Sequence, residues 1–178
     1  MEGGELLDDV TIREFLIASY PRIVAAIALT TGSREVAEDA VQEALARAWE
    51  RSAHGDTIES LPAWVTKVAI NLSRSRFRRM RIESRAVDDL AKRDRTAHSD
   101  DAPEDRVAIE GAIRALPVRQ REVTVLRYYL GMSVSELAVT LGVSEGTVKT
   151  SLHRARGSLA AQLGESIDEE VPDDAASR

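Results

Sequence analysis

Two short amphipathic segments joined by a glycine-containing turn occupy residues 133–156, and they constrain the fold more than any other part of the sequence. Ser133 and Glu136 have the spacing of a capping box at the start of the first segment. Gly142 follows that segment as a helix-ending glycine, and Ser144 is placed to cap the second. This pattern is typical of a DNA-binding helix-turn-helix. The alternative is an ordinary helical hairpin with a solvated outer face.

The second segment has two chemically different faces. Helical spacing gathers Val148, Leu152, Ala155 and Leu159 within one narrow arc, which we expect to be buried. The opposite face is small, polar and basic. Such a face suits a major groove, because bulky apolar groups there would desolvate phosphates and base edges without making hydrogen bonds.

Duplex DNA can be contacted from this outer face in two ways. Thr150 and His153 lie at its centre, where we expect side chains that read base edges. Lys149, Arg154 and Arg156 lie at its rims, where cations suit phosphates.

Composition excludes several classes of protein. The chain has 178 residues and no cysteine, which rules out disulfides and zinc–thiolate sites. It has no apolar stretch long enough for a membrane span or a signal peptide, so we expect a cytoplasmic protein without membrane insertion. We find no nucleophile motif, phosphate loop or dinucleotide fingerprint. The histidines have no metal-ligand spacing, so we predict no catalytic, metal or cofactor site and do not expect an enzyme.

The formal net charge of −6 is unusual for a DNA-binding protein, but the charge is distributed unevenly. Arginines cluster in residues 74–85, whereas the first fifty residues and the segment after Gly164 are mostly acidic. Local fields decide where phosphate binds. We therefore expect weak DNA binding by the chain alone and stronger binding when a larger partner positions it.

The fold class predicted from periodicity is all-α, with two small helical domains joined by a flexible linker. We expect helical segments at 9–29, 34–51 and 62–80, with a capped turn at Thr31-Gly-Ser33 and Pro62 as the first residue of the third. Residues 84–104 are charged and poor in apolar side chains, which is typical of a linker. The predicted boundaries are 9–83 for the first domain, 84–104 for the linker, 105–163 for the second domain and 164–178 for an acidic tail.

The predicted helix 62–80 carries a mixed stripe opposite its apolar side. Aromatic, amide and basic side chains together suit single-stranded DNA, because cations follow the backbone while rings and amides meet unpaired bases. The alternative is a solvated basic helix with a half-buried tryptophan. The stripe consists of Trp64, Lys67, Asn71, Arg74 and Arg78, and the apolar side of Val65, Ala69, Ile70, Leu72 and Phe77.

The predicted helix 34–51 also has two sides. We expect Ala37, Val41, Ala44, Leu45, Ala48 and Trp49 to face the core. Asp39, Gln42 and Glu43 belong to the polar side and should face away from Leu45 and Trp49. A charged stripe is usually only solvated, so docking to a protein is the less common interpretation of this pattern.

Several motifs in one order resemble the bacterial RNA polymerase sigma factors of the extracytoplasmic-function (ECF) type, in the sigma-70 family. Residues 37–49 resemble region 2.2, residues 62–71 with the arginines after them resemble regions 2.3 and 2.4, and residues 116–129 with the helix-turn-helix resemble region 4. The resemblance extends from about Phe15 to Leu163. Leu45 stands where many members have phenylalanine.

The resemblance implies promoter-specific transcription initiation with core polymerase as partner. It places Asp39, Gln42 and Glu43 on the polymerase clamp, and Lys67, Asn71, Arg74 and Arg78 on the melted −10 strand. The loop 52–60 would hold a flipped base through residues that the sequence does not identify.

The resemblance also assigns the linker and the second domain. The linker would run toward the polymerase active-site channel, and the second domain would sit on the flap and read the −35 duplex. An anti-sigma factor is a further partner in this family, and we expect no appended regulatory domain. The alternatives are a stand-alone helix-turn-helix regulator and, with less support, a metal-dependent hydrolase or nuclease that uses the acidic helix.

Overall fold

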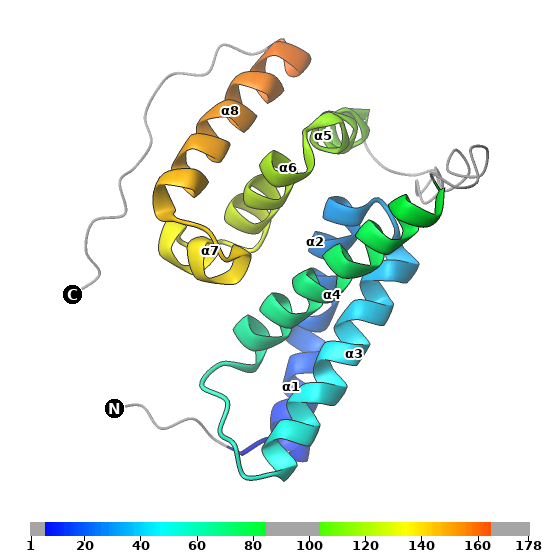
Figure 1. Cartoon of the computed structure of the whole chain (residues 1–178), viewed down its shortest axis with the longest axis vertical. Coiled ribbons are helices and arrows are strands. Elements are labelled where there is room, and N and C mark those ends of the chain that lie inside the picture. Colours follow the sequence, from blue (N-terminus) through cyan, green and yellow to red (C-terminus); the bar gives the residue numbers. More distant parts are fainter. Residues whose placement is uncertain (1–5, 85–103, 165–178) are drawn as a thin grey trace. The chain divides into compact units, whose positions relative to one another are not determined.

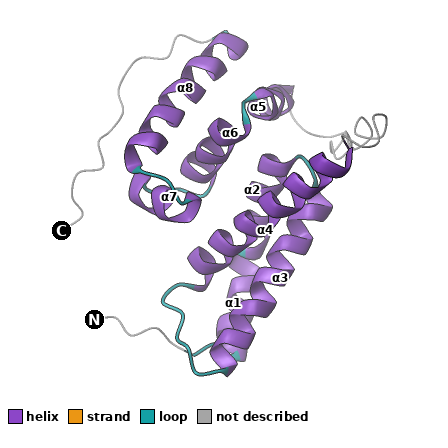
Figure 2. Ribbon diagram, in the orientation of Figure 1, coloured by secondary structure: helices purple, strands orange, loops and turns teal. Residues whose placement is uncertain are grey.

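The computed structural model describes residues 6–84 and 104–164, and these residues form helices joined by loops (Figure 2). The described ranges contain no β-strand. Contacts between residues divide the chain into two units, 1–97 and 98–178. The all-α, two-unit fold predicted from the sequence is confirmed.

The first unit is a bundle of α1 (Asp9–Ala18), α2 (Tyr20–Thr31), α3 (Arg34–Ala53) and α4 (Leu61–Ser84). The last three helices pack against one another, and α1 packs on α2 (Figure 1). Small residues of α3 allow the close approach of its neighbours, since Ala37, Ala40, Ala44 and Ala48 are fully buried. The larger core side chains include Phe15, Ile23, Val24, Ile27, Val41 and Val65.

The predicted helical segment 9–29 is divided in two. Ser19 closes α1 by donating its backbone N–H to the carbonyl of Phe15 (2.9 Å), and α2 begins at Tyr20. Pro21 explains the break, because its nitrogen carries no hydrogen and its ring would clash with the carbonyl of Ile17 in a continuous helix.

The predicted turn between α2 and α3 is confirmed. Gly32 has φ 81°, a left-handed conformation that glycine adopts without strain. Ser33 then caps α3 by accepting a hydrogen bond from the backbone N–H of Val36 (3.3 Å).

The second unit comprises α5 (Glu104–Ala115), α6 (Val118–Thr124), a π-helical turn η1 (Val125–Tyr129), α7 (Val134–Leu141) and α8 (Glu145–Leu163). Helix α8 packs against α5, α6 and α7. The buried side chains that join these helices include Leu116, Val123, Leu126, Leu137, Leu141, Val148 and Leu152.

The helix-turn-helix of α7 and α8 has the caps that the sequence predicts. Ser133 Oγ accepts from the N–H of Glu136 (3.2 Å), and Glu136 Oε2 accepts from the N–H of Ser133 (2.7 Å). Gly142 ends α7 with φ 65°. Ser144 Oγ accepts from the N–H of Thr147 (3.2 Å) and so caps α8.

The predicted linker and tail lie outside the described residues, apart from their ends. Helix α4 ends at Ser84 and α5 begins at Glu104, which are the first and last residues of the predicted linker. Gly164 is the C-cap of α8, and the residues after it are not described.

Candidate nucleic-acid interface

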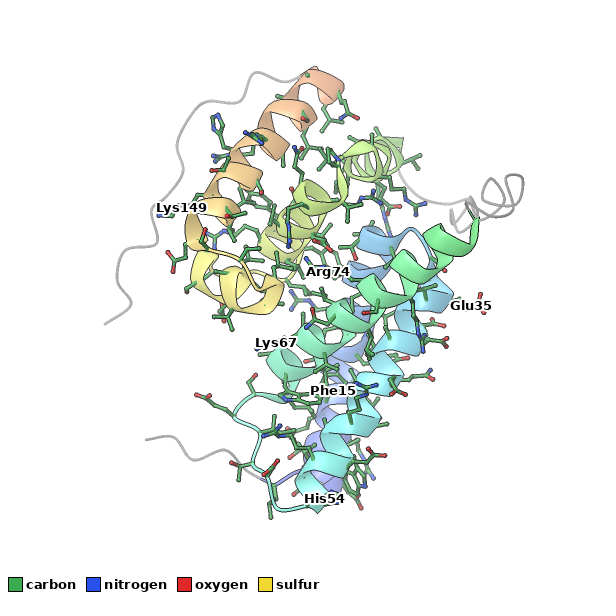
Figure 3. The ribbon with its side chains drawn as sticks, viewed as in Figure 1. Phe15, Glu35, His54, Lys67, Arg74 and Lys149 are labelled. Carbon is green, nitrogen blue, oxygen red and sulfur yellow. The ribbon has the colours of Figure 1, made fainter. Side chains whose placement is uncertain are left out.

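Helix α8 presents the predicted polar face to solvent. Thr150 and His153 are exposed, whereas Val148 and Leu152 on the opposite side are buried. Lys149 and Arg154 are exposed and Arg156 is half-buried (Figure 3, Lys149). Leu159 is half-buried, so the buried arc predicted for this helix weakens toward its C-terminal end.

The hydroxyl groups on and beside this face bond to the helix backbone or to each other. Thr150 Oγ1 donates to the carbonyl of Gly146 (2.8 Å), and Ser151 Oγ donates to the carbonyl of Thr147 (2.7 Å). The hydroxyl oxygens of Thr147 and Ser144 lie 2.9 Å apart. Glycines at 146 and 157 leave the face open, because a Cβ at Gly146 would meet only Ser144 Oγ at 3.8 Å and one at Gly157 would meet nothing within 4 Å.

Helix α4 of the first unit carries the predicted mixed stripe. Lys67 and Asn71 are exposed, and Trp64 and Arg74 are half-buried (Figure 3, Lys67 and Arg74). Successive steps of three, four and three residues keep these four side chains on one face of the helix. The side chain of Arg78 lies outside the described residues.

The opposite side of α4 is buried, as the sequence predicts. Val65 and Ala69 are fully buried, Ile70 is nearly so, and Leu72 is half-buried. The side chain of Phe77 lies outside the described residues. Two polar residues that this pattern left out, Thr66 and Ser73, are also buried. Their hydroxyls donate to the carbonyls of Pro62 (2.7 Å) and Ile70 (2.9 Å), which satisfies them within the helix.

The segment predicted as a loop at 52–60 begins inside a helix. Ser52 and Ala53 belong to α3, and the buried Ser52 hydroxyl accepts from the backbone N–H of Leu7 (2.6 Å). In the connection from α3 to α4, Ile58 is buried, with 6% of its surface exposed. Arg51 and Asp56 pair across its start (3.2 Å).

The predicted docking residues of α3 are engaged with surface partners. Asp39 pairs with Arg76 of α4 (3.0 Å), and Glu43 pairs with Arg47 one turn along α3 (2.9 Å). Gln42 Nε2 donates to the hydroxyl of Tyr20 (3.4 Å). Exposed ion pairs contribute only about 0–1 kcal/mol, so a partner protein can replace them at little cost.

The prediction that Trp49 belongs to the core is wrong. Trp49 is 46% exposed, and Leu45 is only half-buried. The prediction that Gln42 faces away from both is also wrong, because steps of three and four residues place the three on one side of α3. Helix α1 packs on α2, and a groove of about 700 Å³ remains between α1 and this side of α3. The groove is lined by Asp9, Ile12, Arg13, Leu16, Gln42, Leu45, Ala46, Trp49 and Glu50.

A second group that the sequence did not single out is the arginines at the end of α5 and within α6. Arg121 Nη2 donates to the carbonyl of Leu116 (3.3 Å). Burial, and then the positive charge of Arg114, lower the pKa of Arg121, while Glu122 opposes the shift. The buried Nε atoms of Arg114 and Arg121 have no hydrogen-bond partner within the described part of the chain. Their sequence signal was weak, since arginine is the common cation throughout this chain.

Among the described residues, no group of histidine, aspartate and glutamate side chains is arranged to hold a metal ion. None of the helices in residues 6–84 and 104–164 has both the length and the apolar character needed to cross a membrane.

These features define a class of protein: a two-unit, all-helical protein whose second unit carries a helix-turn-helix of the kind that binds DNA. Two family models match this chain, one in each unit, in the order that the sequence predicted. The model for sigma-70 region 2 matches residues 16–83, and the model for sigma-70 region 4 matches residues 106–159.

Individual relatives are similar over most of their length. The ECF RNA polymerase sigma factor SigL of Mycobacterium tuberculosis is 36% identical over 139 residues, which cover 76% of this chain and 78% of that protein. The RNA polymerase sigma-E factor of Streptomyces coelicolor is 36% identical over 133 residues, or 71% of each chain. The structure of the sigma factor RpoE from Bartonella quintana, solved with the anti-sigma factor NepR, superposes with a TM-score of 0.75 at 25% identity, covering 88% of this chain and 98% of that one.

The chain belongs to the ECF RNA polymerase sigma factors of the sigma-70 family. It is therefore a sigma factor that directs promoter-specific transcription initiation, with RNA polymerase core and promoter DNA as its partners. The resemblance predicted from the sequence is confirmed, and the sigma-factor interpretation is favoured over the stand-alone regulator.

Proposed function

We propose that three exposed faces divide the work of this sigma factor. In this scheme α3 docks on the polymerase clamp, α4 holds the melted −10 strand and α8 reads the −35 duplex. The observation that carries the scheme is that each helix buries one side in its own unit, while the predicted residues of its other side that the structure describes are exposed or half-buried.

Polymerase docking is supported by the chemistry beside α3. Gln42 and Glu43 are exposed, and Gln42 also lines the groove with Leu45 and Trp49. An exposed tryptophan next to charged side chains is typical of a protein contact, since aromatic side chains dominate the energetics of interfaces. Asp39 would exchange Arg76 for a clamp cation.

Strand binding is supported by the mixture of groups on α4. Lys67 and Arg74 would follow the phosphates, Asn71 would bond to an unpaired base edge and Trp64 would offer a stacking surface. Arg78 would extend the same stripe. The connection 54–60 between α3 and α4 would supply the pocket for a flipped base.

The second unit would sit on the polymerase flap and place α8 in the −35 major groove. Thr150 and His153 would read bases, while Lys149, Arg154 and Arg156 would hold phosphates. We assign residues 9–83 and 105–163 to the two working domains. Residues 84–104 would be the linker toward the active-site channel, and 164–178 an acidic tail.

Regulation by an anti-sigma factor is part of the proposal. RpoE of Bartonella quintana and CnrH, which superposes with a TM-score of 0.59 at 25% identity, were solved with the anti-sigma factor NepR and with the cytosolic domain of CnrY. We propose a comparable partner for this chain. Because core polymerase and the chromosome share the cytoplasm, we place its non-catalytic activity there.

The docking surface can be tested by introducing positive charge on α3. We expect the double variant Q42K/E43K to bind core polymerase about tenfold to a hundredfold more weakly, because like charges would meet a basic partner. Glu14→Lys is the control, since this residue of α1 is exposed but does not line the groove. Binding of labelled protein to purified core gives the affinities, and circular dichroism checks folding. Equal affinity of wild type and double variant would remove α3 from the docking surface.

A further inference from the structure

The geometry of α8 points to one base-pair preference: we infer that Thr150 reads an adenine–thymine pair in the −35 element, with its hydroxyl acting as a hydrogen-bond acceptor. The inference rests on the proposed −35 role of α8 and goes beyond it by naming the chemistry that one residue recognises. Thr150 is exposed at the centre of the outer face.

A threonine hydroxyl has one hydrogen to donate and two lone pairs that accept. In this helix the hydrogen is already used, because Thr150 Oγ1 donates to the carbonyl of Gly146 at 2.8 Å. Threonine in a helix commonly makes this bond to the carbonyl four residues back. The lone pairs and the methyl group of Thr150 therefore remain to meet DNA.

The major-groove edges of the base pairs select among these remaining groups. Guanine presents only acceptors, N7 and O6, which the occupied hydroxyl cannot satisfy. Adenine offers the N6 amino group as a donor, and its partner thymine offers a methyl group. Cytosine offers an amino group but no methyl. Only the adenine–thymine pair matches both groups that Thr150 has left.

The surroundings of Thr150 allow a base edge to approach. A helical side chain leans toward the N-terminus of its helix, so Thr150 lies over Gly146. A Cβ at Gly146 would fall in nearly open space, and Gly157, about two turns onward on the same face, is also open. Ser151, whose hydroxyl is likewise committed to a backbone carbonyl, lies about 100° around the helix and is half-buried. Thr150 is thus the better placed of the two hydroxyls.

The test compares three variants at one position in holoenzyme reconstituted from core polymerase and the full chain. Wild type and each variant transcribe a library with a randomised −35 element, and sequencing of the transcripts gives the preferences. Thr150→Ser keeps the acceptor without the methyl, Thr150→Val keeps the methyl without the acceptor, and Thr150→Ala removes both. Circular dichroism of each chain checks that α8 still folds.

We expect wild type to favour adenine over guanine about fivefold or more at one −35 position. Thr150→Ser should keep adenine over guanine but accept cytosine equally. Thr150→Val should reduce the adenine over guanine preference to a weak remainder, because only the methyl contact with the paired thymine is left. Thr150→Ala should lose all discrimination at that position.

Two outcomes would overturn the inference. One is a wild-type preference for guanine that Thr150→Val abolishes, because the hydroxyl would then be a donor. The other is an unchanged profile for all three variants. Arg156→Ala and His153→Ala separate this failure from failure of the proposed −35 role. If Arg156→Ala still weakens all promoters together, or His153→Ala changes the profile, α8 remains on DNA and only the Thr150 inference fails.

Discussion

At the scale of single residues, the capping box of α7 couples the second unit to pH. The backbone N–H and the hydroxyl of Ser133 hold the pKa of Glu136 below its usual 4.5, because both bonds favour the charged carboxylate. A lowered folded-state pKa means that this stabilisation is present above pH 4.5 and is lost as the pH falls through the folded value.

We expect Glu136→Gln to keep most of the stability at pH 7, because an amide oxygen can still accept from the Ser133 N–H. It should remove the part of the acid sensitivity that arises at Glu136, whereas Glu136→Ala should lose stability at pH 7 as well. Urea unfolding of the three chains between pH 3 and pH 7 measures both effects. An identical pH profile for Glu136→Gln and wild type would show that this carboxylate is not coupled to folding.

Residues with local signals were the ones that the sequence could predict. The capping pair at Ser133 and Glu136 and the left-handed glycines at 32 and 142 depend on neighbours within four positions, so the pattern alone places them. The exposure of Trp49 depends on whether a distant helix covers it. The buried stripe of α3 continues through Ala48 to Ser52, so Trp49 lies at its edge, and no local signal shows which edge of an apolar stripe another helix covers.

At the scale of elements, α4 carries arginines on two sides, and the two sides have different expected partners. Arg74 lies on the stripe with Lys67 and Asn71, whereas Arg76 points to the other side and pairs with Asp39 of α3. Two arginines of one helix therefore provide a matched comparison.

We expect Asn71→Ala and Arg74→Ala to slow open-complex formation more on a duplex promoter than on a pre-melted bubble, where the cost of unpairing has been removed. Arg76→Ala removes the same charge away from the stripe, so any defect should be equal on both templates. Rates of open-complex formation, followed by stopped-flow fluorescence with each holoenzyme, give the ratio. Equal defects for Arg74→Ala on duplex and bubble would assign this residue to docking or folding.

Elements were predicted better than the spaces between them. Periodicity gave α3, α4, α7 and α8, because each buries one side over several turns. The groove beside α3 could not be predicted, since it exists only because α1 turns at Ser19 and packs on α2. The turn η1 was missed because its residues, which apart from Arg127 are apolar or aromatic, carry no signal that distinguishes a π-helical turn from an α-helix.

At the scale of the whole molecule, a chain with a negative net charge has to bind DNA, which is also negatively charged. The net charge of −6 opposes association with DNA, while the cations of α4 and α8 favour it locally. Core polymerase would overcome this repulsion by holding the α4 and α8 faces on one promoter, which raises their effective concentration at the DNA. Promoter recognition should therefore belong to the complex more than to the free chain.

In vitro transcription with purified core polymerase, with and without this chain, tests that claim most directly. On a library of randomised promoters, we expect core polymerase alone to start transcription without preference. Core polymerase with the chain should start at sites that share one −35 and one −10 element. The chain alone should bind duplex promoter DNA only weakly in a gel mobility assay. Tight binding of the free chain to duplex DNA, with promoter-specific starts only when a different sigma factor is supplied, would contradict the account and identify a stand-alone regulator.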